Sequence, residues 1–223
     1  MNHQFTLLLE AGVDEAGKGP LLGPVFAAAV ILDPTIPLLP CLRDSKKMTK
    51  KNRAIARVWI EDNAIAFGVG SSSEVEIDKD NIRNATFTAM HRALDVLGAS
   101  PEHISVDGNC FQDYNSIPYR CIVKGDSIFA NISCASILAK EAHDDYIKQI
   151  VLENPDLDVH YGLLSNMGYG TATHMGGLTS FGPTVYHRHT FAPVTRVLER
   201  LDPSLVRGSS GKGKPNIVKN FVG

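Results

Sequence analysis

Residues 12–24 read Gly-Val-Asp-Glu-Ala-Gly-Lys-Gly-Pro-Leu-Leu-Gly-Pro, and the interpretation of the whole chain starts from this stretch. Two adjacent carboxylates, Asp14 and Glu15, stand before Lys18, which has a glycine on either side. Apolar residues lie before and after the stretch. The pattern predicts a buried strand that carries two acids at its end, followed by a tight turn. Acids at a strand end attract divalent cations, and glycines let backbone N–H groups approach a sugar or phosphate closely.

The composition is that of a globular protein with a substantial core. Of the 223 residues, 43% are hydrophobic and 21% are charged, which suits one large domain or one domain with an appendage. The net charge is −2 and the pI is about 6.4, so any face that binds nucleic acid must be a local feature. The chain contains no apolar run long enough to span a membrane.

Cysteine usage and the first residues both favour an intracellular protein. The 4 cysteines form no C-x-x-C pair, so reduced thiols are favoured over a disulfide framework or a zinc site. The first residues lack the basic region and the apolar core of a signal peptide. We therefore expect a cytoplasmic location.

Apolar runs alternate with turn residues in an order that predicts a mixed α/β sheet with helices on its faces. Strands are expected over residues 7–13, 25–32, 64–70, 104–108 and 120–123. Helices are expected over residues 50–62, 73–97, 128–152 and 194–201, the first of them capped by Thr49. Residues 162–177 are rich in glycine, and Gly176 and Gly177 weaken a helix after Thr171.

Four acids stand at strand ends or at junctions between a strand and a helix, namely Asp14, Glu15, Asp107 and Asp126. Neighbouring strands lie only about 5 Å apart, so acids at their ends converge and need a cation. Oxygen ligands without a nearby Cys–His cluster favour Mg²⁺ or Mn²⁺ over zinc. Two such ions about 4 Å apart can activate water and stabilise a leaving oxygen during phosphodiester cleavage.

Each acid also has a purely structural interpretation. Asp126 could cap the helix that follows it, and Asp107 before Gly108 could be a turn residue. The adjacent pair, Asp14 and Glu15, is harder to explain in this way, because two charges at the end of an apolar strand are costly without a partner. The residues alone leave the four-acid site as a hypothesis.

Several short motifs, taken together and in order, closely resemble those of ribonuclease HII of the bacterial type. They are Gly-Val-Asp-Glu-Ala-Gly-Lys-Gly-Pro at 12–20, Asp-Ser-Lys-Lys at 44–47, Val-Asp-Gly-Asn at 106–109, Val-Lys-Gly-Asp-Ser at 123–127, Ala-Ser-Ile-Leu-Ala-Lys at 135–140, Gly-Tyr-Gly-Thr at 168–171, Gly-Pro-Thr at 182–184 and His-Arg at 187–188. One block alone is weak evidence, whereas all of them in this order are highly specific. The resemblance covers residues 11–194.

The resemblance implies a ribonuclease H-like fold, in which helices flank a mixed sheet and a helical extension follows at the C-terminus. It implies a metal-dependent endonuclease that hydrolyses the RNA strand of RNA–DNA hybrids. It also implies cleavage on the 5′ side of single ribonucleotides embedded in duplex DNA, with 3′-hydroxyl and 5′-phosphate ends. The implied cofactor is a pair of Mn²⁺ or Mg²⁺ ions, and the implied catalytic and metal-binding residues are Asp14, Glu15, Asp107 and Asp126.

The resemblance also assigns substrate recognition. Gly17, Lys18 and Gly19 match the element that reads the ribose 2′-hydroxyl largely through its backbone, and Lys18 stands where the family commonly has arginine. That hydroxyl is the group that distinguishes RNA from DNA at a given position. Tyr169 matches the tyrosine that stacks on the sugar next to the junction. Further substrate contacts are expected from Ser45, Lys46, Lys124 and Arg188, although the lysines also fit a solvated charged surface.

We expect residues 1–185 to form the catalytic domain, residues 186–207 a helical appendage and residues 208–223 a flexible basic tail. The expected partners are RNA–DNA hybrid and duplex DNA with embedded ribonucleotides. The protein is expected to be a monomer that does not bind membranes. The tail could contact a replication clamp, although disorder is the default for such a segment.

Three competing interpretations were weighed against this one. A dinucleotide-binding oxidoreductase fails because Gly17, Gly19 and Gly23 give G-x-G-x-x-x-G with Pro20 inside it. A non-catalytic module that binds RNA–DNA hybrids is the main alternative, and the presence of all four acids argues against it. Ribonuclease HIII is a related enzyme, but no additional N-terminal substrate-binding domain is evident.

Overall fold

The computed structural model describes residues 1–42 and 48–202, which form two compact units. The first, called here the sheet unit, comprises Met1–Lys18, Pro24–Ser73 and Ile82–Asp145. The second, called here the helical unit, comprises Gly19–Gly23, Glu74–Asn81 and the chain from Tyr146 onward. The division into a catalytic domain at 1–185 and a helical appendage at 186–207 remains a prediction. The tail at 208–223 lies outside the described residues.

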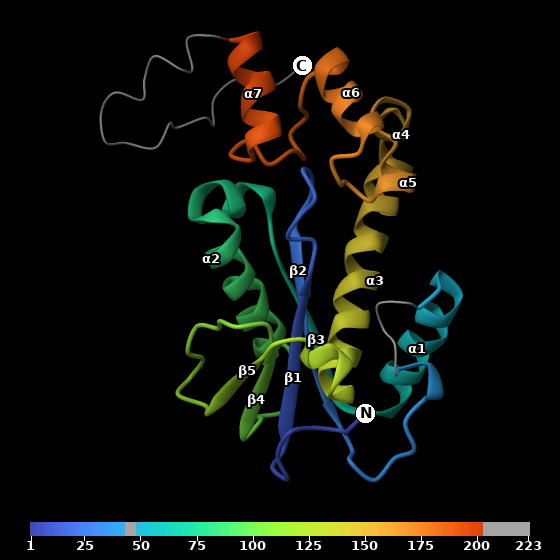
Figure 1. The fold of residues 1–223 in the computed structure, drawn as a ribbon, viewed down its shortest axis with the longest axis vertical. Coiled ribbons are helices and arrows are strands. Elements are labelled where there is room, and N and C mark those ends of the chain that lie inside the picture. Colours follow the sequence, from blue (N-terminus) through green and yellow to red (C-terminus); the bar gives the residue numbers. More distant parts are fainter. Residues whose placement is uncertain (43–47, 203–223) are drawn as a thin grey trace. The chain divides into compact units, whose positions relative to one another are not determined.

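A five-stranded mixed sheet forms the centre of the sheet unit, with strand order β3-β2-β1-β4-β5 (Figure 1). Strand β1 runs antiparallel to β2 and parallel to β4, β2 runs antiparallel to β3, and β4 runs parallel to β5. The mixed sheet expected from the sequence is therefore confirmed. The strands are β1 (Glu10–Ala16), β2 (Val25–Leu32), β3 (Ala64–Ser72), β4 (His103–Asp107) and β5 (Tyr119–Ile122).

Helices occupy most of the remaining described chain. They are α1 (Lys50–Asn63), α2 (Glu74–Asp95), α3 (Ala130–Glu153), α4 (Asp156–Tyr161), α5 (Leu163–Asn166), α6 (Ala172–Phe181) and α7 (Ala192–Leu201), together with a 3₁₀ turn, η2 (Gly125–Ser127). The expected cap of α1 is confirmed, because the Thr49 side chain accepts a hydrogen bond from the backbone N–H of Asn52. None of the described helices is both long and apolar enough to cross a membrane.

Helices α2 and α3 cover opposite faces of the sheet, and glycines on the strands allow both to approach closely. A Cβ at Gly12 would lie 2.4 Å from backbone atoms of α3, and one at Gly68 would lie 2.3 Å from a backbone oxygen of α2. Gly12 pairs with Val30 and Gly68 pairs with Ala29. Successive strand residues face opposite sides, so these two contacts lie on different faces.

The core of the sheet unit includes the face covered by α1 and α3. Ala28, Val30 and Leu32 of β2 pack there with Ile60 of α1 and Leu138 of α3. All of β2 except Phe26 is buried, which confirms the expectation that this continuous apolar run is an interior strand.

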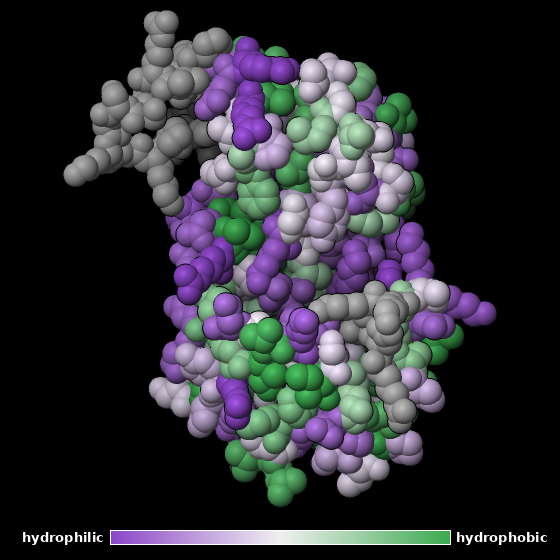
Figure 2. All heavy atoms as spheres, in the orientation of Figure 1, coloured by the Kyte–Doolittle hydropathy of each residue, from purple (hydrophilic) through white to green (hydrophobic). Residues whose placement is uncertain are grey.

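The first strand begins later than expected, at Glu10 instead of residue 7. The Glu10 carboxylate is buried and accepts hydrogen bonds from the backbone N–H groups of Phe5 at 2.9 Å and Thr6 at 2.6 Å. These bonds hold residues 5–9 as a loop, in which Leu7 is fully exposed. Figure 2 shows hydrophobic residues at the lower end of this face, where Figure 1 places that loop. At its other end, strand β1 continues to Ala16 and so includes both Asp14 and Glu15.

Helix α2 is not the continuous helix expected over residues 73–97. Asn81 has φ 69° and ψ 161°, which breaks the helix near its first third, and the last helical residue is Asp95. Its residues Ile77, Ala85, Met90 and Leu94 are buried, as is Leu97 just after it. Ile82, which directly follows the break, is only half-buried.

In the helical unit, α5 and most of α6 lie within the glycine-rich residues 162–177, and a helix does follow Thr171 although Gly176 and Gly177 were expected to weaken it. A Cβ at Gly177 would lie 2.1 Å from the backbone oxygen of His160 in α4. Glycine therefore permits close packing of α6 on α4, which outweighs its low helix propensity. The Thr171 side chain caps α6 by accepting from the backbone N–H of His174. The core of this unit includes Leu22, Tyr161, Leu163, Leu178, Val194 and Leu198.

Candidate active site

The ends of β1 and β4 bring two of the expected acids next to each other. Val13 and Val106 are paired in the parallel ladder, and Asp14 and Asp107 each follow by one residue. The backbone N–H of Gly125 donates to Asp107 Oδ1 at 2.7 Å. Since Gly125 directly precedes Asp126, this bond ties the loop that carries the fourth acid to the strand that carries the third.

The side chains of Asp14 and Glu15 point to opposite faces of the sheet, because successive side chains alternate along a strand. Asp14 is buried, and the side chain of Ser136 on α3 forms a hydrogen bond with it. Glu15 Oε1 instead lies 2.6 Å from Nζ of Lys18. The alternation explains why two adjacent acids have different partners.

The charge of Asp107 lies close enough to Asp14 and Glu15 to disfavour the ionisation of both carboxyl groups. Burial raises the pKa of Asp14 well above its usual value, and the charges of Glu15 and Asp107 raise it further. Burial also raises the pKa of Glu15, an effect that Lys18 opposes and Asp107 increases. A nearby cation would relieve this repulsion.

Three such carboxylates provide a chemically suitable donor set for Mg²⁺ or Mn²⁺, which prefer hard oxygen ligands. Nevertheless, within residues 1–42 and 48–202 no group of three or more His, Cys, Asp or Glu side chains stands in an arrangement that could hold a metal ion. Asp126 is buried, and its Oδ1 accepts from the Ser127 hydroxyl at 3.2 Å. It lies inside the turn η2, four residues before α3 begins. Metal binding by the four acids therefore remains a prediction.

The glycine turn after β1 depends on a histidine that sequence reasoning did not identify. Gly17 has φ +87°, and a Cβ there would lie 2.7 Å from Cδ2 of His143. His143 is buried on α3, with its Nδ1 3.2 Å from Asp144 Oδ1. Both the backbone conformation and the packing therefore require glycine at position 17. No spacing in the sequence connects His143 with this turn.

In the helical unit, the structure brings together two expected recognition residues, Gly19 and Tyr169. A Cβ at Gly19 would lie 3.1 Å from Cε1 of the Tyr169 ring, and that ring residue is 44% exposed. The backbone oxygen of Tyr169 accepts from the N–H of Thr171 at 2.8 Å and lies 3.0 Å from Nδ1 of His174. Tyr169 is thus an accessible ring on a well-anchored backbone.

Asn166 supports the same segment and was also missed as a positioning residue. Its side-chain amide donates to the backbone oxygen of Tyr161 at 2.6 Å, and its Oδ1 accepts from the N–H of Gly168 at 2.9 Å. Gly168 has φ +81°, and its oxygen accepts from the N–H of Leu21 at 2.8 Å. This turn fixes the residue that precedes Tyr169.

Arg188 requires a correction, because the expected substrate contact is fully buried. Its Nε donates to the oxygen of Gly23 and its Nη1 donates to the oxygen of Pro20, both at 2.8 Å. The guanidinium also lies over the ring of Phe191. Arg188 therefore positions residues 20–23, the backbone that follows the glycine turn, and is not exposed at the surface.

The structure describes some of the other expected substrate contacts and not others. Lys18 is half-exposed beside Glu15, and Lys124 is exposed in the left-handed conformation, φ 58°, at the start of η2. Ser45 and Lys46 lie outside the described residues. Both lysines therefore lie at the surface of the sheet unit, Lys18 in an ion pair with Glu15.

A family model described as ribonuclease HII matches residues 11–194. The chain belongs to the ribonuclease HII family. It is 49% identical over 183 residues to the ribonuclease HII of Parabacteroides distasonis, which covers 82% of this chain and 89% of that protein. It is 47% identical over 191 residues to the ribonuclease HII of Christiangramia forsetii, which covers 86% of this chain and 94% of that protein.

Solved structures show the same ribonuclease H-like fold. Ribonuclease H2 from Pyrococcus horikoshii OT3 matches with TM-score 0.70 and 22% identity over 86% of this chain and 97% of that chain. Bst-RNase HIII in complex with Mn²⁺ matches with TM-score 0.67 and 20% identity. That match covers 90% of this chain and 72% of the other. The RNase HII in the PCNA:RNase HII complex from Archaeoglobus fulgidus matches with TM-score 0.65 and 20% identity. That match covers 84% of this chain and 96% of the other.

Family membership identifies the chain as an endonuclease of the ribonuclease H type, a phosphodiester hydrolase. The oxidoreductase interpretation is thereby excluded. The acids on β1 and β4 and the glycine turn after β1 lie within the segment that the family model matches. These are the features from which substrate and mechanism can be inferred.

Proposed function

We propose that this enzyme hydrolyses the RNA strand of RNA–DNA hybrids and also cuts duplex DNA on the 5′ side of a single embedded ribonucleotide. The observation that carries the proposal is the raised pKa of Asp14 and of Glu15 beside the glycine turn, to which burial and the charge of Asp107 both contribute. Clustered carboxylates that disfavour one another's ionisation favour a bound cation. The adjacent turn offers backbone groups to a ribose.

In the proposed reaction a water oxygen attacks the phosphorus on the 5′ side of the ribonucleotide. The bond from phosphorus to the O3′ of the preceding nucleotide breaks, and that oxygen takes up a proton. The products are a 3′-hydroxyl and a 5′-phosphate. Two divalent ions, when bound, would supply Lewis-acid stabilisation of the leaving oxygen and a more acidic attacking water.

The acids of the chain would provide the ligands. Asp14 and Asp107, adjacent across β1 and β4, would serve both ions, and Glu15 and Asp126 would each complete one ligand set. Ser136 would orient the Asp14 carboxylate through its hydrogen bond. Lys18 would keep Glu15 ionised, since its charge opposes the increase that burial causes in the pKa of Glu15.

Recognition of the ribonucleotide would come from the turn at residues 17–19 and from Tyr169. Backbone groups at Gly17 and Gly19 would bind the 2′-hydroxyl, because no side chain blocks their approach. The half-exposed Tyr169 ring would stack on the neighbouring sugar and reject a 2′-hydroxyl at that position. A step from RNA to DNA would therefore be preferred over a step within RNA.

The structural relatives give chemical support for the cofactor. The solved Bst-RNase HIII holds Mn²⁺, and we propose Mn²⁺ or Mg²⁺ for this enzyme. The Archaeoglobus RNase HII was solved with PCNA, and a contact between the tail of this chain and a sliding clamp is a corresponding proposal. Removal of ribonucleotides from DNA is the biological role that fits this chemistry.

The direct test is cleavage of a DNA duplex with one embedded ribonucleotide, in Mg²⁺, in Mn²⁺ and in EDTA. The expected result is one metal-dependent cut on the 5′ side of the ribonucleotide. Asp14→Asn should abolish cleavage and retain binding, whereas Asp62→Asn, which changes an exposed acid of α1, should cut normally. Cleavage of long hybrids alone would reject the junction specificity. Binding without cleavage in any metal would favour the non-catalytic hybrid-binding module.

A further inference from the structure

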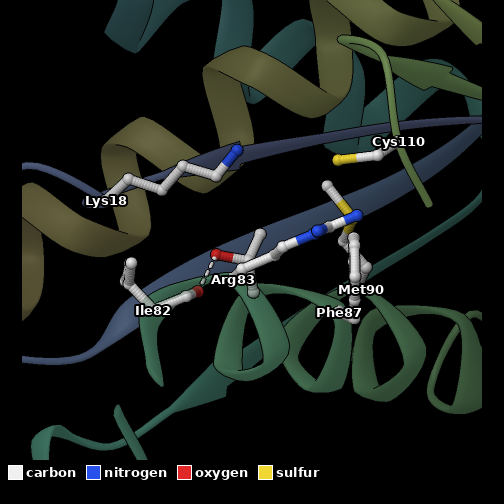
Figure 3. A pocket seen from close by; sticks show the side chains of 7 residues that line it. Lys18, Ile82, Arg83, Phe87, Met90 and Cys110 are labelled. Atoms are coloured by element: carbon white, nitrogen blue, oxygen red, sulfur yellow. Dashed lines mark hydrogen bonds between the residues drawn. The ribbon is translucent and has the colours of Figure 1, made fainter. Parts of the chain in front are cut away.

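A pocket of about 190 Å³ lies in the sheet unit beside the lysine that pairs with Glu15. Figure 3 shows Lys18 on one side of it, Cys110 at one end, and α2 residues forming the opposite wall. The α2 residues are Ile82, Arg83, Thr86, Phe87 and Met90. The pocket therefore lies on the face of the sheet that α2 covers, next to the predicted catalytic acids.

Two cationic side chains reach the pocket from different elements. Lys18 follows β1, and its Nζ lies 2.6 Å from Glu15. Arg83 extends from α2, with its guanidinium carbon 5.7 Å from the centre of the Phe87 ring. Figure 3 shows the Arg83 side chain lying along the pocket toward Met90 and Cys110. None of the lining residues is acidic, so an anion in the pocket would lie beside the positive charge of Arg83 and beside Lys18, which also pairs with Glu15.

The remaining lining gives the pocket an apolar floor. Phe87 and Met90 are buried, with 8% and 1% of their surfaces exposed. The Thr86 hydroxyl donates to the backbone oxygen of Ile82 at 2.7 Å, which satisfies its donor inside the helix. A ligand that fits has a negative group between the cations and a carbon-rich surface beneath it. A phosphate attached to a sugar has both features.

The volume argues against an independent small-molecule site. Pockets that enclose a whole ligand commonly measure about 300–1,000 Å³. This one is smaller, and it adjoins the proposed cleavage site through Lys18 and Glu15. It fits one backbone unit of a longer ligand that continues past the pocket.

We propose that the pocket binds a phosphodiester of the nucleic-acid duplex near the one that is cut, with Arg83 as a positioning residue. The proposal rests on the proposed function, since it takes the same duplex as ligand. Arg83 donates to the phosphate while its guanidinium keeps its place over Phe87. Lys18 adds a second positive charge, and the sugar lies against the apolar floor.

The first experiment measures duplex binding in EDTA at several salt concentrations, so that cleavage is not required. Each phosphate contact contributes about 0.9 to the slope of log K against log salt concentration. Arg83→Gln should reduce the slope by about that amount and weaken binding severalfold. Arg83→Lys should retain the slope with weaker binding, because a lysine keeps the charge and loses the planar guanidinium.

Arg92→Gln is the matched control, because Arg92 lies on the same helix, does not line the pocket and donates to the backbone oxygen of Ser71. Its slope should equal that of the unmodified protein. An unchanged slope for Arg83→Gln, or an equal reduction for Arg92→Gln, would overturn the proposal. Absence of cleavage by the unmodified protein would refute the proposed function while leaving this slope measurable.

Cys110 provides an independent readout, because its thiol lines the same pocket. Bound duplex should slow alkylation of Cys110, measured by mass spectrometry, and should slow it less in Arg83→Gln. Cys41, which does not line the pocket, serves as the internal reference. Equal alkylation of Cys110 with and without duplex would contradict the proposal. Equal protection by inorganic phosphate alone would also contradict it, because it would indicate a general anion site.

Discussion

The ring of Tyr169 lies against Gly19, where an added Cβ would come within 3.1 Å of Cε1. Gly19→Ala must therefore displace the ring or the turn by a few tenths of an ångström. We expect kcat/KM for a duplex with one ribonucleotide to fall about tenfold, equivalent to about 1.4 kcal/mol in the barrier. Thermal unfolding should change little. Steady-state kinetics will measure the effect, with Tyr169→Phe as a reference that keeps the ring. An unchanged kcat/KM in Gly19→Ala would exclude a role for the position of the Tyr169 ring.

Gly176 and Gly177 are adjacent in α6 but should respond to alanine in opposite ways. A Cβ at Gly177 would lie 2.1 Å from the oxygen of His160, whereas one at Gly176 meets nothing within 4 Å. Gly176→Ala should stabilise the protein by about 0.5–1 kcal/mol through helix propensity. Gly177→Ala should destabilise it by about 1–3 kcal/mol through steric conflict. Urea unfolding of both variants measures the difference, and a shared sign would contradict the packing of α6 on α4.

Buried His174 and His187 should make stability fall in mild acid. Their Nε2 atoms lie 3.0 Å apart, and burial lowers the pKa of His187 to about 3 from a usual value of 6.5. Between these pH values the unfolded chain binds more protons, so unfolding becomes easier as the pH falls. The loss can reach about 1.4 kcal/mol per pH unit for one histidine.

Urea unfolding between about pH 7 and about pH 5 tests this pH dependence. His187→Gln should make it shallower, whereas His91→Gln, which changes a histidine that bonds the oxygen of Gln112, should not. If the unfolding free energy changed equally with pH in the unmodified protein and both variants, groups other than His187 would cause the loss of stability in acid.

Arg188 should contribute to stability and only indirectly to catalysis. Replacement by methionine leaves the oxygens of Gly23 and Pro20 without these donors, at about 1–3 kcal/mol each. We expect Arg188→Met to lose about 3 kcal/mol of unfolding free energy. Arg196→Met, at an exposed position of α7, should change it by less than about 0.5 kcal/mol. Normal stability with weaker binding in Arg188→Met would instead support a direct substrate contact.

Ser136 should tune the cation requirement through its hydrogen bond to Asp14. Ser136→Ala removes the group that favours the charged carboxylate, and we expect the metal concentration for half-maximal activity to rise about 10–100-fold. Ser133→Ala is the matched control on α3, since its hydroxyl donates to the oxygen of Leu42. An identical metal requirement for both variants and the unmodified protein would remove Ser136 from the site.

Strand β2 and helix α1 were predictable because their signals are local. A continuous apolar run specifies an interior strand, and Thr49 before an amphipathic segment specifies a helix start. The start of β1 was wrong, because Glu10 draws the backbone of Phe5 and Thr6 into a loop through hydrogen bonds. A buried acid with several N–H partners is not visible in hydrophobic periodicity.

The positions of Asp14, Glu15 and Asp107 followed from their motifs, but their arrangement did not. Alternation along β1 places Asp14 toward Ser136 and pairs Glu15 with Lys18, which the linear pattern did not show. Arg188 illustrates the opposite error, since its motif suggested an accessible cation and folding buried it. Whether a charge faces solvent or a carbonyl depends on elements far away in the chain.

The family, the mixed sheet and the identity of the candidate acids could be read from the chain alone, since ordered motifs and apolar periodicity are properties of neighbouring residues. Folding in three dimensions was needed to show that Gly17 packs against His143, that Gly177 packs against α4, and that Arg83 shares a pocket with Lys18. These relationships join residues distant in the chain. They depend on close packing between elements, which residue spacing along one strand or helix does not encode.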